Sequence, residues 1–373
     1  MSIFPAMTSL AADTARPRTA DPLAAPHPGD RAVGLWLLAV AAMIFAMAVI
    51  GAVTRLTESG LSIMEWAPVS GVLPPLSQAE WERLFALYKT IPEYQQLNAG
   101  MSLAEFKEIF WWEWLHRLWG RLIGAVFLGG FLLLLWRRRI RRDLTGHLAA
   151  MFALGGLQGL LGWYMVASGF ADRVDVSQYR LAAHLGLALA IYAYVLWIAL
   201  RLLAPAPALS ADAHGLRRGL WGFAGLVALT ILAGALVAGL NAGLSYNTYP
   251  LMDGRLVPDS YLIRQPWWIN VFETPAAVQF NHRMLAQLAV AAALGLWLWS
   301  RRAALAATAR RAFDLLALAA LGQLALGVWT LLWVVPVWLG ALHQAGAILV
   351  LSLTVWALTR LAPTPIPARE AAA

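Results

Sequence analysis

The sequence predicts an all-α membrane protein with eight transmembrane helices, arranged as two pseudo-symmetric four-helix bundles. Of its 373 residues, 60% are hydrophobic and only 13% are charged, and the mean hydropathy is +0.64. Soluble proteins carry about 25% charged residues, so a soluble single domain and a disordered chain are both excluded. The apolar residues fall into runs of about 20, the length that spans a bilayer. An internal repeat then divides these runs into two sets of four.

Eight apolar runs are the predicted helices. They cover residues 33–54, 112–136, 147–168, 179–202, 219–240, 277–299, 311–333 and 337–360. The segment before the first run is rich in Ala, Pro and Asp and lacks the basic start and apolar stretch of a secretory signal. We therefore expect residues 1–30 to be a disordered cytoplasmic tail and residues 363–373 to be a second cytoplasmic tail.

The distribution of charge predicts the orientation in the membrane. The segments that follow the second, fourth and sixth helices carry clusters of arginine, whereas the long segments at about 57–110 and 241–276 are richer in acidic residues. Basic residues concentrate on the cytoplasmic side of membrane proteins. Both termini are therefore predicted to be cytoplasmic, with the two long segments facing the periplasm or its equivalent. The net charge of +8 reflects this topology, so the lipid bilayer is the predicted partner and nucleic acid is not.

The repeat relates the two halves motif by motif. It pairs Gly51–Ser62 with Gly234–Ser245, Glu113–Arg117 with Gln279–Arg283, Gln158–Gly162 with Gln323–Gly327, and His184 with His343. Each half has an even number of helices, so both halves have the same orientation and the repeat is of the parallel kind. The predicted boundary gives an N-terminal half at residues 31–205 and a C-terminal half at 206–362.

Four of the seven histidines predict metal chemistry inside the membrane. They lie one on each even-numbered helix, about five to seven residues from its outer end, at His116, His184, His282 and His343. Ionisable residues in a bilayer are costly and usually functional. A lone histidine could simply bond to a neighbouring helix, but four in a duplicated pattern favour two heme sites, each with two axial imidazoles. The absence of cysteine excludes iron–sulfur clusters and thiolate-ligated or covalently attached heme.

The two halves differ three residues before the first histidine of each pair. Glu113 in the first half corresponds to Gln279 in the second, on the same helix face as the histidine. A carboxylate can accept a proton or stabilise positive charge, which an amide cannot do well, so Glu113 is the candidate catalytic residue. The simpler alternative is an interfacial charge. Arg117 and Arg283 are candidate partners for heme propionates, with snorkelling arginines as the alternative.

At these residues the sequence resembles the heme A synthase family over about residues 33–350. The motifs that carry the resemblance are, in chain order, Gly51-Ala-Val-Thr-Arg-Leu-Thr-Glu-Ser-Gly-Leu-Ser62 with Trp66, Pro68, Gly71, Pro74 and Pro75, then Glu113-Trp-Leu-His116-Arg117, Val176-Ser-Gln-Tyr-Arg-Leu-Ala-Ala-His184, Asn247-Thr-Tyr-Pro-Leu-Met-Asp-Gly254, Val278-Gln-Phe-Asn-His-Arg283 and His343-Gln-Ala-Gly-Ala347. Because it has no cysteine, the sequence resembles the cysteine-free branch typical of alphaproteobacteria and mitochondria.

The resemblance implies an oxidoreductase that converts a ring methyl group of heme O into a formyl group by successive hydroxylations, giving heme A for cytochrome oxidase. It implies that His282 and His343 ligate a resident heme b, that His116 and His184 hold the substrate heme O, and that Glu113 is the catalytic carboxylate. Heme O synthase is the expected partner, and assembly as a homo-oligomer stays open.

Two other function classes compete with this interpretation. A di-heme b membrane cytochrome that transfers electrons would explain the four histidines, but not the replacement of Glu113 by Gln279. It also predicts hemes on both sides of the membrane, whereas all four histidines here lie near the outer side. A transporter built from a repeat predicts helices broken at the midplane, and the sequence has no paired Gly/Pro interruptions there.

Overall fold

The computed structural model describes residues 27–67, 70–170, 173–204 and 211–361. Eight of the helices in these ranges are long and apolar enough to cross a membrane. They are α1 (Asp30–Leu56), α4 (Leu103–Trp136), α5 (Arg142–Val166), α6 (Gln178–Leu203), α7 (Ala211–Gly239), α9 (Pro275–Arg302), α10 (Ala307–Leu332) and α11 (Val337–Arg360). Most of the predicted tail 1–30, the tail 363–373, the boundary at 205/206 and Pro68 lie outside the described residues.

The prediction of eight membrane-spanning helices is confirmed, and two of the helices start well before their apolar runs. Helix α7 starts eight residues before the run at 219–240, and α4 starts nine residues before the run at 112–136. The early start of α4 has a local cause. The hydroxyl of Ser102 accepts from the backbone N–H of Glu105, whose carboxylate accepts from the N–H of Ser102 in return. This capping box begins the helix outside the apolar run.

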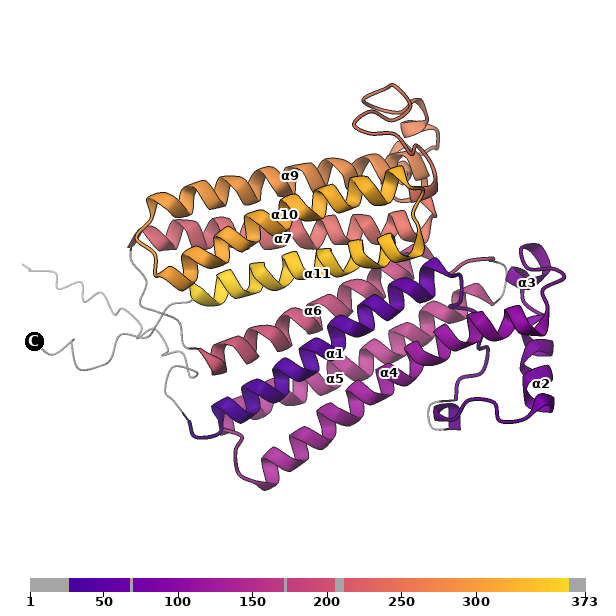
Figure 1. The fold of residues 1–373 in the computed structure, drawn as a ribbon, viewed down its shortest axis with the longest axis horizontal. Coiled ribbons are helices and arrows are strands. Elements are labelled where there is room, and N and C mark those ends of the chain that lie inside the picture. Colours follow the sequence, from indigo (N-terminus) through magenta and orange to yellow (C-terminus); the bar gives the residue numbers. More distant parts are fainter. Residues whose placement is uncertain (1–26, 68–69, 171–172, 205–210, 362–373) are drawn as a thin grey trace, which may run out of the picture.

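The eight helices pack with the same neighbours in each half of the chain. In the first half α1 contacts α4 and α6, and α5 contacts α4 and α6; in the second half α7 contacts α9 and α11, and α10 contacts α9 and α11. The halves meet through α6, α1, α7 and α11, and Figure 1 shows α6 and α11 next to each other at the middle of the molecule. Each contact in one half thus has its counterpart in the other. Pseudo-symmetry in space stays a prediction.

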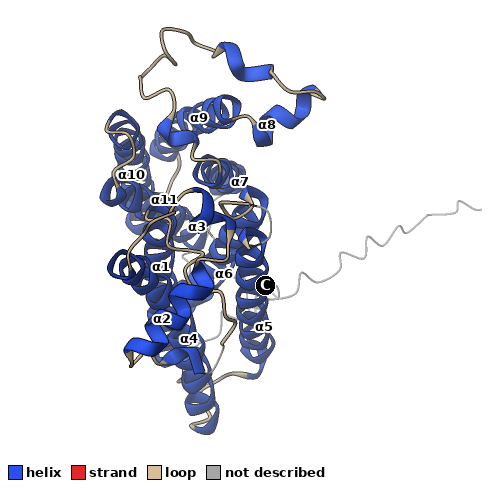
Figure 2. Cartoon of the chain, turned by 90° about the vertical axis from the view of Figure 1, so that its right-hand side faces the viewer, coloured by secondary structure: helices blue, strands red, loops and turns tan. Residues whose placement is uncertain are grey.

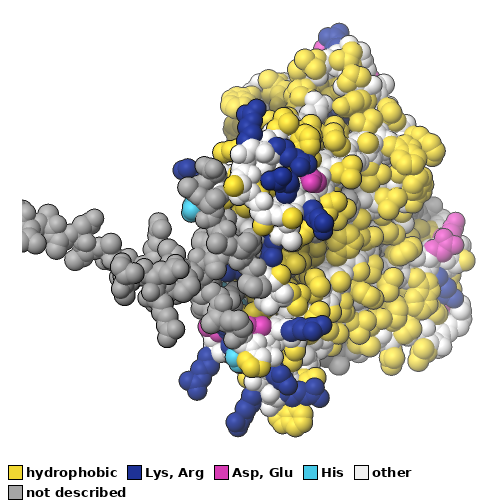
Figure 3. All heavy atoms as spheres, turned by 60° about the vertical axis from the view of Figure 1, so that its left-hand side comes forward, with side chains coloured by type: hydrophobic (Ala, Val, Ile, Leu, Met, Phe, Trp, Pro, Cys, Tyr) yellow, Lys and Arg dark blue, Asp and Glu magenta, His cyan; other side chains and the backbone are white. Residues whose placement is uncertain are grey.

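The two ends of the bundle differ in character. The long segments before α4 and before α9 both emerge at one end (Figure 1). Viewed onto this end, α2 (Gln78–Tyr88) and α3 (Pro92–Gln96) cross the first half, and the segment with α8 (Asn270–Glu273) lies beside α9 (Figure 2). Lys and Arg side chains gather at the opposite end, while apolar side chains cover the flank (Figure 3). This arrangement suits the predicted orientation.

A small apolar core holds the outer helices of the first half onto the extension of α4. The Phe85 ring stacks on the Phe106 ring with their centroids 5.0 Å apart, and the Trp81 ring packs edge-on against the Phe110 ring with their centroids 4.7 Å apart. Aromatic pairs in these geometries contribute about 0.5–1.5 kcal/mol beyond the area they bury. The sequence predicted only a loop here, because these helices are too short and too polar to produce a membrane-length apolar run.

Glu93 lies buried in this outer core. Its carboxyl group, 3% exposed, accepts a hydrogen bond from the Tyr88 hydroxyl at 3.1 Å. The amide of Asn98 donates to the same hydroxyl at 2.8 Å. Burial raises the pKa of Glu93 from 4.5 to about 8, with a smaller opposing effect from the Tyr88 hydrogen bond. The side chain is therefore mostly neutral at pH 7.

This burial predicts a pH-dependent stability of the outer core. The unfolded carboxyl ionises above about pH 4.5 and the folded one only near pH 8, so unfolding releases a proton in between. Stability is therefore highest below pH 4.5 and declines toward pH 8, by at most about 1.4 kcal/mol per pH unit. Glu93→Gln keeps the Tyr88 hydrogen bond and should flatten the decline of the melting temperature between pH 5 and pH 8. Glu108→Gln, at an exposed carboxyl group, is the control. If the melting temperature of Glu93→Gln declined as steeply with pH as that of the wild-type protein, the prediction would be wrong.

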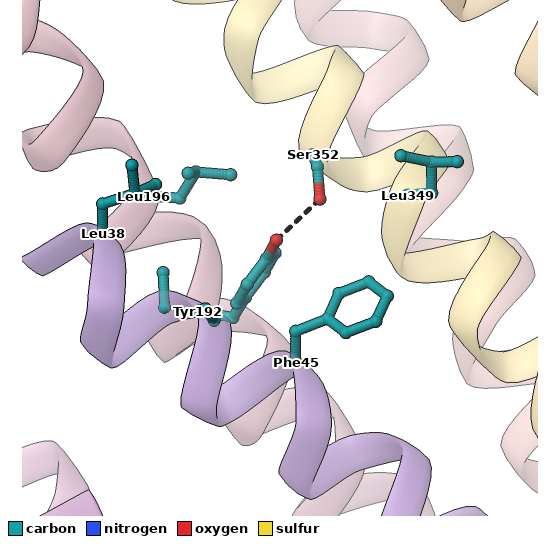
Figure 4. A pocket seen from close by; sticks show the side chains of 8 residues that line it. Leu38, Phe45, Tyr192, Leu196, Leu349 and Ser352 are labelled. Atoms are coloured by element: carbon teal, nitrogen blue, oxygen red, sulfur yellow. Dashed lines mark hydrogen bonds between the residues drawn. The ribbon is translucent and has the colours of Figure 1, made fainter.

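Polar contacts and a groove lie where the two halves meet. Arg55 on α1 donates to the carbonyl of Ala238 and to the side chain of Asn241, both at 2.9 Å, and pairs with Asp175 at 3.3 Å. Deeper in the membrane, a cavity of about 300 Å³ opens on the flank, and the Tyr192 hydroxyl of α6 hydrogen-bonds Ser352 of α11 at 2.7 Å across it (Figure 4). The other labelled side chains that line it are apolar: Leu38, Phe45, Leu196 and Leu349.

Candidate heme sites

The structure brings the four predicted histidines together in two pairs. His282 of α9 and His343 of α11 face each other with ring centroids 6.3 Å apart and ring planes at 89°. His116 of α4 and His184 of α6 lie within electrostatic range of each other. All four side chains are partly exposed. Each pair thus joins the two histidines of one half of the chain.

The separation of His282 and His343 suits two axial ligands of one metal. Imidazole nitrogens bind metals at about 2.0–2.1 Å. Two rings on opposite sides of a metal at that distance have centroids about 6 Å apart, close to the observed 6.3 Å. Among the described residues, no group of three or more His, Asp and Glu side chains could hold a metal ion. The donor set therefore suits a macrocycle that brings its own equatorial ligands.

A glycine on the neighbouring helix faces each of the four rings. A Cβ built at Gly51 would lie 3.3 Å from Nε2 of His116. In the other three pairs the nearest ring atom is Cε1: it lies 2.8 Å from a Cβ at Gly162 for His184, 2.9 Å from one at Gly234 for His282, and 2.8 Å from one at Gly327 for His343. Contacts this short force the ring to move. The glycines thus leave the space that the imidazoles occupy, and they come from the four helices that carry no histidine of the set.

These contacts predict a sharp difference between two glycines of α10. Gly327→Ala should displace the His343 ring and lower the heme content of the second half by about tenfold, in line with the cost of losing support for a metal ligand. Gly322→Ala is the matched control, because a Cβ there meets nothing within 4 Å. The heme-to-protein ratio of each purified variant measures the effect. Equal ratios in the two variants would rule out a steric role for Gly327.

Polar groups at Nδ1 hold three of the four rings. Nδ1 of His282 lies 3.0 Å from the carbonyl of Thr230 on α7. The amide nitrogen of Gln323 lies 3.0 Å from Nδ1 of His343, and that of Gln158 lies 3.1 Å from Nδ1 of His184. Each glutamine also donates to the backbone carbonyl of its histidine. Such contacts fix the ring orientation, and the Thr230 carbonyl, as an acceptor, also raises the basicity of His282 as a metal ligand.

The two glutamines also carry unused acceptors. Oε1 of Gln158 and Oε1 of Gln323 are buried without a hydrogen-bond partner among the described residues. An imidazole that binds a metal through Nε2 carries its proton on Nδ1 and needs an acceptor there. Rotation of either amide would present that acceptor. These orphaned oxygens, together with the glycine-lined space, fit a heme bound by the histidines.

Glu113 forms a buried network at the outer end of the first site. It is 2% exposed, and its Oε2 accepts from the Ser62 hydroxyl at 2.8 Å and from the backbone N–H of Ile63 at 2.7 Å. Its Oε1 accepts from Nε of Arg117 at 3.0 Å and from Nη2 at 2.7 Å. The carboxylate therefore accepts four hydrogen bonds, two of them from a charged partner. It joins the segment after α1 to α4.

Gln279 occupies the corresponding place in the second half, but it donates hydrogen bonds where Glu113 accepts them. Its amide nitrogen donates to the carbonyls of Ala242 at 2.8 Å and Ser245 at 2.5 Å, where Glu113 accepts from Ser62 and Ile63. Its oxygen accepts from Arg283 at 2.9 Å. The second site thus has a neutral amide at this place, whereas the first has a buried carboxylate one turn outward of His116.

The two arginines predicted as propionate partners bond to the protein in matching ways. Arg117 donates to the carbonyls of Ile63 at 2.6 Å and Glu65 at 2.9 Å. Arg283 donates to those of Tyr246 at 2.6 Å and Thr248 at 3.0 Å. Pairing with propionates stays a prediction, since these contacts already account for most of the guanidinium donors.

The sequence did not identify the residues that support the histidines. Gln158, Gln323 and the facing glycines are all within the repeated motifs, so the signal was present as matched positions in the two halves. The Thr230 carbonyl could not be found in this way, because every residue has a carbonyl and only the packing of α7 on α9 selects this one.

Eight spanning helices and two pairs of intramembrane histidines define a multi-pass membrane protein with two candidate heme sites. Residues 34–355 match the family described as cytochrome oxidase assembly protein. The chain is 52% identical to the heme A synthase of Rhodospirillum centenum, over 90% of each chain. It is 49% identical to the heme A synthase of Parvibaculum lavamentivorans, over 89% of this chain and 94% of that one. The chain therefore belongs to the cytochrome oxidase assembly protein family, which acts in heme A biosynthesis.

Proposed function

We propose that this protein is a heme A synthase, an oxidoreductase that converts a ring methyl group of heme O into a formyl group. The relatives named above support the activity. The observation that carries the assignment to this chain is the difference between two otherwise matching sites. Both have two histidines, facing glycines and a glutamine, but only the first has the buried carboxylate of Glu113. One site is thus suited to chemistry and the other to permanent binding.

The proposal assigns the N-terminal half, residues 31–205, to the substrate and the C-terminal half, residues 206–362, to the cofactor. His116 and His184 would hold heme O. His282 and His343 would hold heme b, which when bound supplies one-electron transfer. The Thr230 carbonyl and the Gln323 amide hold the second pair of rings in place, as a resident cofactor requires. Support for the cofactor assignment comes from the donor set and the 6.3 Å ring separation.

Glu113 would act by charge rather than by taking a proton. Its four acceptor positions are filled by Ser62, Ile63 and Arg117, so a proton could bind only after a donor has left. A fixed carboxylate at this place favours positive charge that develops on the substrate during oxidation. The network also keeps the outer segment over the site, which limits the access of water.

The proposal places the protein in the inner membrane of a bacterium, with both termini in the cytoplasm. The arginine-rich end of the bundle supports this orientation (Figure 3). Both histidine pairs then lie near the outer surface. Heme O is an apolar substrate, and heme O synthase is the partner that we expect to deliver it within the bilayer.

Identification of the bound hemes tests the proposal. The full chain is purified in detergent after expression with and without heme O synthase, and the extracted hemes are separated by chromatography. Heme b together with heme O, its alcohol or heme A would support a heme A synthase. Two hemes b per chain, unchanged by heme O synthase, would instead indicate a di-heme electron-transfer cytochrome, and a protein without heme would refute both.

A further inference from the structure

The four histidine rings are alike in their place on the helices but differ in how they are held. His184, His282 and His343 each have a polar contact at Nδ1 within 3.1 Å. For His116, the described residues provide no hydrogen-bond partner to the ring. The helix that faces His116 is α1, the counterpart of α7 in the repeat, but no carbonyl in the described residues of α1 contacts the His116 ring as the Thr230 carbonyl contacts His282.

The His116 ring also has a different orientation. The other three rings present Cε1 to their facing glycine, with Nδ1 as the next atom at 3.4 Å. His116 presents Nε2 to Gly51 at 3.3 Å, with Cδ2 next at 3.7 Å. Its ring is therefore turned over about the Cβ–Cγ bond relative to the others. Nε2, the nitrogen that would bind heme iron, is thus the atom of His116 nearest to its facing glycine, whereas in the other three rings Nε2 lies farther from that position, at 3.6 Å.

We infer that His116 is the exchangeable axial ligand of the substrate heme and that His184 is the fixed one. This inference rests on the proposed function. A hydrogen bond donated by Nδ1–H to an acceptor, such as the unpartnered Oε1 of Gln158 after rotation of its amide, orients a ligating imidazole and raises its basicity, and its loss typically weakens metal binding about 10- to 100-fold. His184 has a neighbour that can provide this support, Gln158, and His116 does not. The iron–Nε2 bond of His116 is therefore the weaker of the two.

Release of His116 would open one position on the iron without losing the substrate. The iron–Nε2 bond breaks, its electron pair stays on the nitrogen, and the ring turns to the place it has in this structure, against Gly51. No electron or proton leaves the heme in this step. The freed position lies on the side of α4, which also carries Glu113 one turn outward. In the second site both rings have a polar contact at Nδ1, so both histidines would hold a heme there, which would supply one-electron transfer.

Matched histidine variants test the inference by spectroscopy rather than by activity. Full-length protein is purified after expression with heme O synthase, and heme O and heme b are quantified in His116→Ala and His184→Ala. We expect His116→Ala to retain heme O in a five-coordinate, high-spin form that binds carbon monoxide when reduced. We expect His184→Ala to contain at least about tenfold less heme O, as the loss of a supported ligand implies. Heme b is the internal control for folding and should be unchanged in both.

The wild-type protein and a Gln158 variant provide independent readouts. Reduced wild-type protein should bind carbon monoxide at the heme O iron and not at the heme b iron. Gln158→Leu removes the support of His184 and should lower the heme O content about tenfold, while Gln323→Leu should lower heme b instead. The inference would be overturned if His116→Ala and His184→Ala lost heme O equally, or if His184→Ala retained heme O and His116→Ala lost it. Wild-type protein that never contains heme O would overturn the proposed function itself.

Discussion

Glu113→Gln should abolish the oxidation while leaving both hemes in place. Removing a group that stabilises developing charge typically costs about 10²–10³ in rate. The variant should therefore accumulate heme O and form at least about 100-fold less heme A. A glutamine at 113 cannot copy Gln279, because it faces the N–H of Ile63, whereas Gln279 faces two carbonyls. Extraction and chromatography of the bound hemes measures the outcome.

The variant also breaks a buried ion pair, and the controls must separate that effect from catalysis. Loss of one member of such a pair destabilises by about 3–5 kcal/mol, so the melting temperature should fall. Glu65→Gln removes a carboxylate from the same segment, where it pairs with Arg83 at the surface, and should keep activity within about twofold, as expected of an exposed pair. Full heme A formation by Glu113→Gln would refute a chemical role. Loss of heme O together with activity would indicate that Glu113 only maintains the site.

His343→Ala should remove the resident heme b and with it all heme A formation. The ring faces His282 at 6.3 Å, and removal of one of two axial ligands leaves the iron with a single protein bond. The heme b content should fall at least about tenfold, because even the loss of a residue that only supports a ligand weakens metal binding about 10- to 100-fold. Pyridine hemochrome spectra of the purified protein measure this, and His282→Ala should behave in the same way.

The matched histidine variants of the other half provide the control. His116→Ala and His184→Ala leave the second pair untouched, so their heme b content should equal that of the wild-type protein. The opposite result would be retention of heme b in both His343→Ala and His282→Ala and its loss in His116→Ala or His184→Ala. It would show that the first half holds the cofactor and the second half the substrate. This comparison is independent of activity, because the bound hemes are counted directly.

Much of the fold could be predicted because the signals that define it are local in sequence. Hydrophobic runs place the eight helices, and α11 begins and ends at the predicted residues 337 and 360. The outer helices α2 and α3 were not predicted. The residues that stabilise them, such as Phe106 and Phe110, lie in the extension of α4, which is itself outside the apolar run.

The site divides in the same way. Comparison of the two repeated halves identified all four histidines and the difference between Glu113 and Gln279, because matching positions can be found by aligning the sequence with itself. The contacts that distinguish one histidine from another could not be predicted. Nδ1 of His184 meets Gln158 on another helix, and the same edge of His116 has no such neighbour among the described residues.

By itself, the sequence determined the number of spanning helices, their predicted orientation and the residue types of two candidate heme sites. These properties follow from hydrophobicity, charge and repetition along the chain. Only the tertiary structure decided the ring separation of His282 and His343, the four hydrogen bonds of Glu113 and the turned ring of His116. These depend on how far each helix is rotated and shifted against its neighbours, and side-chain packing between distant segments sets that rotation.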